Sequence, residues 1–152
     1  MHSRIFQVSS EPIKKEDYIE EATYWDHWFI GEIADYVADS DRNYDIKWLK
    51  GCCDGVTFGT NDNGEYFIVE SKEQYFQHKF KRFKNAVDTI KSCTLEEFTK
   101  EMHAVWELKN AYEERFGFYV DTDGELLNFD NFIRLCVTNE KYYIGGTIDY
   151  HC

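Results

Sequence analysis

Three carboxylates in the first third of the chain have the residue types and spacing that come nearest to a reactive site. Glu32, Asp35 and Asp39 follow one another at spacings of three and four, which would place them on one arc of a helix. Three oxygen ligands on one side of a helix suit a hard cation such as Mg²⁺. The sequence places no second carboxylate cluster beside them. We therefore expect a solvated acidic surface and no metal site.

Lys109 is the second residue whose position invites a chemical role. It falls within an apolar stripe, between Val105 and Tyr112. Burial would lower the pKa of its amine and make it a candidate nucleophile or base. Alternatively, its methylenes cover apolar surface while the amine reaches water or a carboxylate such as Glu113, and we expect this second role.

Two acidic, glycine-containing segments resemble calcium-binding loops only in part. Residues 119–130 and 59–70 have glycine at the sixth loop position, but Tyr119 and Gly59 stand where the first carboxylate should be. Both segments lie between strand-like runs, so we predict β-turns. The chain has no GxSxG, Walker or GxGxxG motif, its five histidines are scattered, and its five cysteines lack CxxC spacing. We predict no catalytic residue, metal or cofactor.

The helix predicted for residues 72–92 is the strongest pattern in the chain. Its apolar residues recur at spacings of four, three, four and three, and they are Phe76, Phe80, Phe83, Val87 and Ile90. Six basic and two acidic side chains give this segment a net charge of +4, so the other residues carry −16 of the chain total of −12. The basic helix can pair with acidic parts of its own chain, dock on an acidic partner or contact phosphates. The first is the simplest account, and Lys84 and Asp88 can also pair at i,i+4.

The flanking elements predict an α+β fold. Before the helix lie a strand at 3–9, a helix at 24–39 with the acidic triplet, an undecided piece at 44–49 and a hairpin at 56–69. A capping box at Thr94 and Glu97 begins a helix predicted to reach residue 115 or 116. Strand-like runs then occupy 118–120, 125–129, 132–137 and 142–150, with Gly145-Gly146 predicting a bulge or a close backbone approach.

We therefore predict a single domain over residues 1–152: an antiparallel sheet built from hairpins, with two or three helices packed on one face. The helices at 72–92 and 94–116 should form an antiparallel pair over that face. The chain has no secretory signal and no apolar run of roughly 20 residues. These features predict a cytoplasmic protein that does not enter a membrane.

Charge and aromatic content together predict a protein that binds other proteins. The net charge of −12 argues against direct nucleic-acid binding, and 12 Phe, 11 Tyr and 4 Trp exceed what a small core needs. We expect a non-enzymatic interaction module whose acidic, tyrosine-rich surface meets a basic surface, as an inhibitor or a nucleic-acid charge mimic. The candidate contact residues are Glu32, Asp35, Asp39, Lys81, Lys84 and Lys109.

Two alternatives stay open. One is a small enzyme or ligand-binding domain with a pocket between helices and sheet, using Lys109, Glu32 and His27. The other is a structural subunit that exists as a homodimer.

Overall fold

Strand β7 (Lys141–His151) is the strand on which the sheet is assembled. It pairs antiparallel with β1 (His2–Ser9) along one edge. On its other edge it pairs with β4 (Gly64–Val69) near its beginning and with β2 (Tyr36–Asp39) near its end. The computed structural model describes all residues from Met1 to Cys152. Six strands of its seven-stranded sheet have the order β3-β4-β7-β1-β5-β6, and the seventh, β2, pairs with β7.

Two tight hairpins form the ends of this sheet. β3 (Val56–Asn61) turns into β4, and β5 (Tyr119–Thr122) turns into β6 (Glu125–Asn128). In the second turn Asp123 and Gly124 both have positive φ, at 53° and 84°, as a two-residue turn matched to the strand twist requires. The predicted β-turns are therefore confirmed. β5 pairs parallel with β1, so the α+β fold has a mostly, but not entirely, antiparallel sheet.

Both faces of the sheet are covered. On one face α2 (Arg42–Cys52) and α6 (Phe129–Leu135) enclose a core that includes Phe6, Leu49 and Phe67. The undecided piece at 44–49 is thus helical, and Asp41 caps it by accepting hydrogen bonds from the amides of Asn43 and Tyr44. The opposite face is covered by the largely irregular segment 15–34, with η1 (Lys15–Asp17), η2 (Glu21–Tyr24) and α1 (Phe29–Glu32).

The glycine pair in β7 is both a bulge and a site of close approach. Phe6 lies opposite Thr147 and Val8 opposite Ile144, so two residues of β7 face the single residue Gln7. The Gln7 side-chain oxygen accepts from the amides of Gly146, at 2.9 Å, and Ile19, at 3.1 Å. A Cβ on Gly146 would lie 2.6 Å from the Ile19 carbonyl oxygen. The bulge therefore docks the covering segment against the sheet.

The helix predicted at 24–39 does not form. Within the four residues of α1, Ile30 (ψ 125°) and Gly31 (φ +90°) already depart from helical geometry. Residues 36–39 then become β2, because β7 offers unpaired backbone groups at that edge. The acidic triplet therefore lies on short elements of different kinds.

The strand predicted at 132–137 is also wrong, because residues 129–135 form α6. Phe129, Phe132, Ile133 and Cys136 are all buried, and their spacings of three, one and three are helical. The Asn128 side chain caps this helix by accepting from the Asp130 amide at 2.9 Å.

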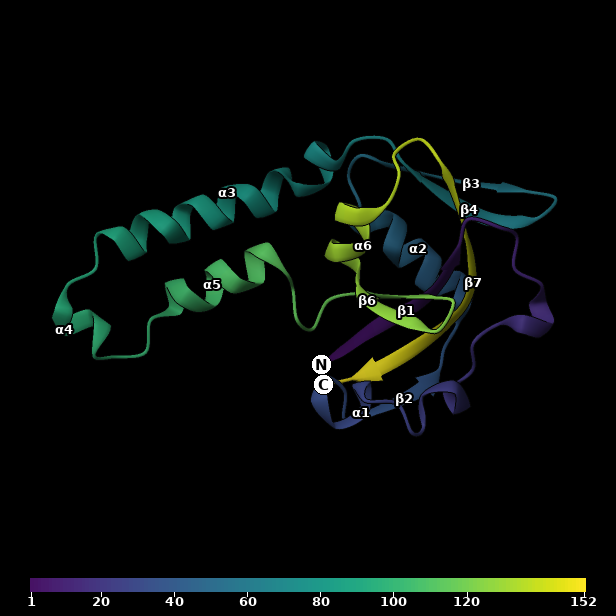
Figure 1. The fold of residues 1–152 in the computed structure, drawn as a ribbon, viewed down its shortest axis with the longest axis horizontal. Helices are drawn as coiled ribbons and strands as arrows, with labels where there is room; N and C mark the ends of the chain where they lie inside the picture. Colours follow the sequence, from purple (N-terminus) through teal and green to yellow (C-terminus); the bar gives the residue numbers. More distant parts are fainter.

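The two predicted central helices do pair, but they do not lie over the sheet. α3 (Lys72–Lys91) and α5 (His103–Tyr112) extend away from it as an antiparallel arm, with α4 (Leu95–Phe98) at the tip (Figure 1). The capping box at Thr94 and Glu97 is present. Its helix ends after one turn, because residues 94–101 are exposed and no packing supports a continuous helix to residue 116. No helix has the length and apolar character needed to cross a bilayer.

Candidate protein-binding arm

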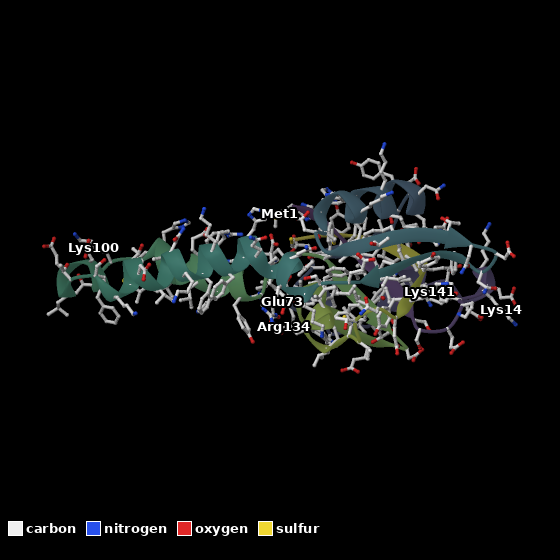
Figure 2. The ribbon with its side chains drawn as sticks, turned by 90° about the horizontal axis from the view of Figure 1, so that it is seen from above. Met1, Lys14, Glu73, Lys100, Arg134 and Lys141 are labelled. Atoms are coloured by element: carbon white, nitrogen blue, oxygen red, sulfur yellow. The ribbon has the colours of Figure 1, made fainter.

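We define the arm as residues 72–116, and it buries very little of its own surface. Its only buried residues are Ala86 in α3 and Ala111 in α5, two small side chains. The two helices form a single layer, which leaves one open face on each side of the pair. Figure 2 shows Lys100 at the far end of the arm and Glu73 at its root.

The buried carboxylate of Asp130 fixes the root of the arm to the body. Its Oδ1 accepts from the Tyr75 hydroxyl at 2.9 Å. Its Oδ2 accepts from Lys79 Nζ at 3.0 Å and from the Glu114 amide at 3.1 Å. Burial, followed by the charge of Asp130, raises the pKa of Tyr75, so its hydroxyl remains a donor at neutral pH. Both segments of the arm are thus attached to one side chain of α6.

Arg134 forms a second attachment on one face of the root. Its guanidinium carbon lies 4.6 Å from the ring centre of Phe76 and 4.1 Å from that of Tyr112. It also donates to the Tyr112 carbonyl, while Lys72 Nζ donates to the Arg134 carbonyl at 2.7 Å. Stacking of this kind fixes a guanidinium over apolar rings.

The face beside Arg134 is apolar, and we call it the apolar face. Phe76, Phe80, Phe83, Ala111 and Tyr112 line a hollow of about 290 Å³ there, together with Lys79 and Arg134. The helical period adds Val87 of α3 and Val105 and Leu108 of α5 to the same side. Phe80 is 63% exposed and Tyr112 54% exposed, so the face is uncovered. It adjoins the end of α6, where Leu135 and Val137 are exposed as well.

The opposite face of the arm is polar. Arg82 donates to Glu107 at 3.0 Å across the two helices. Both side chains line a shallow hollow on this face, together with Asn85, Thr89 and His103. The arm is therefore amphipathic across its thickness, with one large ring beside the polar hollow, because Trp106 is 56% exposed and stacks on His103.

The predicted contact lysines lie on this arm, and none is in an ion pair. Lys81, Lys84 and Lys109 are exposed, and the expected Lys84–Asp88 pair is absent. Among the basic residues of α3, only Lys79 and Arg82 pair with carboxylates of their own chain. Intramolecular neutralisation of the basic helix is thus partial.

The three predicted acidic contact residues do not act as one cluster, because each has different hydrogen-bond partners. Asp35 lies 3.2 Å from His151, and Asp39 accepts from the Glu21 amide at 3.1 Å. The carboxylate of Glu32 has no bonded partner, although its backbone carbonyl accepts from Arg115 at 2.7 Å. No group of three or more His, Cys, Asp or Glu side chains is arranged to hold a metal ion.

The residues of the enzyme alternative do not meet. Lys109 is on the arm, Glu32 is in α1, and the His27 ring packs against Tyr24 and Trp28. A cavity of about 280 Å³ does lie between the arm root and the body, with Cys52, Cys53, Tyr75, Lys79 and Asp130 among its lining residues. Burial raises the pKa of both cysteine thiols. The polar groups of Tyr75, Lys79 and Asp130 are bonded to one another, which leaves them committed to holding the arm.

Comparison with known proteins identifies no relative of this chain. No protein family, curated protein or solved structure matches this chain significantly. The case for function therefore depends on the geometry of the arm.

Sequence reasoning missed Asp130 and Arg134, which position the arm. Their helix lies where the sequence analysis predicts a strand, although the spacing of Phe129, Phe132, Ile133 and Cys136 is helical. The sequence does predict the apolar stripe of α3, but as a surface that packs on the sheet instead of an open face.

Proposed function

We propose that this protein is a non-enzymatic interaction module that binds a protein through the apolar face of its arm. The observation that supports this proposal is a rigidly rooted pair of helices whose large apolar side chains project from the body without cover. Contiguous apolar patches above a few hundred Å² are uncommon on monomeric proteins and mark interaction sites. An amphipathic helical surface of this kind recognises apolar anchors at helical spacing.

The charged residues beside the apolar face indicate the chemistry of the partner surface. Lys84 follows Phe80 by four residues, and Lys91 follows Val87 by four, so both lysines lie beside the apolar rings. Neither lysine is in an ion pair. The complementary surface is therefore apolar with carboxylates at its edge.

A photo-crosslinking pair tests this function in the producing cell. Benzoylphenylalanine replaces Lys84, beside the apolar face, or Asn85, which lines the polar face. We expect position 84 to give a discrete covalent product and position 85 to give none. Adding Phe80→Glu should abolish the product, whereas His78→Glu should not. Absence of a product at position 84, or equal products at both positions, would overturn the proposal.

An acidic stretch that includes most of the covering segment and β2 supports a second candidate function, contact with a basic protein surface as a charge mimic. Residues 16–41 contain nine Asp and Glu and no Lys or Arg, and Trp25, Trp28 and Tyr36 are exposed among them. The test uses a fluorescent nona-arginine peptide as a probe at low and physiological salt. Asp26→Lys should weaken its binding much more than Asp62→Lys in the β3–β4 turn. Equal effects would show only non-specific charge attraction.

A further inference from the structure

We infer that the partner of the apolar face is a second copy of this chain, and that the two arms pack into a four-helix bundle. This inference rests on the proposed function and names the occupant of the same face. Closed two-fold dimers are the commonest protein oligomers, and they bury the same surface of both subunits. A two-helix layer with one apolar face is half of such a bundle.

The charge distribution within the arm favours a second copy over an unrelated partner. Residues 72–92 carry a net charge of +4, and residues 93–116, with three basic and six acidic side chains, carry −3. A second copy would therefore offer the basic α3 a segment of opposite net charge.

The same charges select between two symmetric arrangements. A two-fold axis along the arm places α3 of each copy opposite α5 of the other copy. A two-fold axis across the arm places α3 opposite α3, which brings two segments of +4 together. Opposite charges across an interface favour the first arrangement, and like charges oppose the second. In the first arrangement the two bodies lie at the same end of the bundle.

The apolar face also continues onto the body at that end. Arg134 stacks on Phe76 and Tyr112, and Leu135, the next residue, is 74% exposed. Val137 is exposed as well. With parallel arms, these residues at and after the end of α6 approach their equivalents in the other copy and extend the contact from the bundle to the bodies.

The uncovered area is of the size that a stable dimer needs. The large exposed apolar side chains on the apolar face and at the end of α6 are Phe80, Val105, Tyr112, Leu135 and Val137, whereas Leu95, Phe98, Trp106 and Phe116 are exposed elsewhere on the arm. Since an aromatic side chain offers about 150–250 Å² when fully exposed, these five residues supply on the order of 400–500 Å² of apolar surface per copy. A standard interface buries about 800 Å² per partner, of which about 60% is apolar.

Sedimentation equilibrium of the purified protein tests the inference. We expect twice the chain mass of 18.2 kDa at micromolar concentration. Phe80→Glu should weaken self-association by about 30-fold or more, because it places a charge within the apolar contact. His78→Glu, on the side of α3 turned away from that face, should leave the dimer intact. Circular dichroism must show that both variants are folded.

A distance measurement tests the arrangement. Spin labels attached at position 100, near the tip, should lie within about 20 Å of each other when the arms are parallel. Crossed or opposed arms would separate them by roughly the length of α3, about 30 Å. A long distance would overturn the parallel bundle.

The outcomes separate this inference from the proposed function. The protein could be monomeric and still give, from position 84, a crosslinked product whose mass is not that of two chains. This result would overturn the second copy as the partner and would support the interaction module. A monomer without any crosslinked product overturns both.

Discussion

Lys79 of the arm donates a 3.0 Å hydrogen bond to the buried carboxylate of Asp130 in the body. The side chain of Asp130 is only 3% exposed, and it also accepts from Tyr75 and the Glu114 amide. One carboxylate thus connects α3, the segment after α5 and α6. The direction in which the arm projects depends on it.

Replacing Asp130 with Asn should loosen the root of the arm. The amide would turn an N–H₂ group toward existing donors and leave Lys79 without its buried partner, at a cost of about 2–4 kcal/mol of unfolding free energy. Urea denaturation measures this loss, and hydrogen exchange should speed up in α3 and α5. Asp62→Asn, at an exposed site in the β3–β4 turn, should change neither. Unchanged exchange in the arm helices would contradict the role of Asp130.

Gly146→Ala and Gly51→Ala should have opposite effects on stability. A Cβ at position 146 would meet the Ile19 backbone at 2.6 and 2.9 Å, so the covering segment must shift, and we expect a loss of about 2 kcal/mol or more. A Cβ at position 51 meets nothing within 4 Å inside α2, and alanine there should add about 0.5–1 kcal/mol. Thermal unfolding of the two variants compares them. A neutral Gly146→Ala would mean that the covering segment is not held against the bulge.

Arg42→Ala should destabilise the fold and alter its response to acid. Arg42 donates to the carbonyls of Gly145 at 2.6 Å and Ile144 at 2.8 Å, and to Glu65 at 2.7 Å. Its removal leaves these acceptors without their donor, and we expect a loss of about 2–3 kcal/mol at pH 7. Lys47→Ala, exposed on the same helix, serves as the matched control.

The effect of Arg42→Ala on stability should depend on pH because Arg42 is bonded to Glu65. The hydrogen bond from Arg42 lowers the pKa of Glu65, so this pair stabilises the fold above the unfolded pKa of the carboxyl group. That contribution is lost as the pH falls through the folded pKa. The difference between wild type and Arg42→Ala should therefore narrow between about pH 5 and pH 3 in urea denaturation. A difference that stays constant over this range would show that Glu65 is not coupled to Arg42.

Stability should fall steeply above pH 10. Burial raises the pKa of Tyr119 to about 12, and it raises the pKa of Tyr24, Tyr75 and Tyr150 further. An unfolded tyrosine releases its proton near pH 10.0 while the folded one retains it, so each such group lowers stability by up to about 1.4 kcal/mol per pH unit in this range. Tyrosinate absorbance should rise together with the loss of circular dichroism. Tyr119→Phe should reduce the pH slope by about one proton, and exposed Tyr44→Phe should not.

Local pattern was sufficient for elements whose partners are close in the chain. The hairpin at 56–69, the helix at 72–91 and the turn at Asp123-Gly124 were all predictable from periodicity and turn chemistry. The glycine pair at 145–146 indicated a bulge, but its distant partner Gln7 was not predictable. The parallel pairing of β1 with β5 was not, because it joins residues more than a hundred positions apart. β2 was missed for a related reason, since its strand form depends on an open edge of β7.

The sequence by itself determined that α3 is an amphipathic, basic helix within an acidic chain, because helical period and charge are properties of neighbouring residues. Only the tertiary structure decided what the apolar stripe faces. Asp130 and Arg134, from a helix about fifty residues later in the chain, fix the root so that the arm points away from the sheet. A stripe that would be core above a sheet thereby becomes an open surface, since periodicity reports which residues share a face and not what covers it.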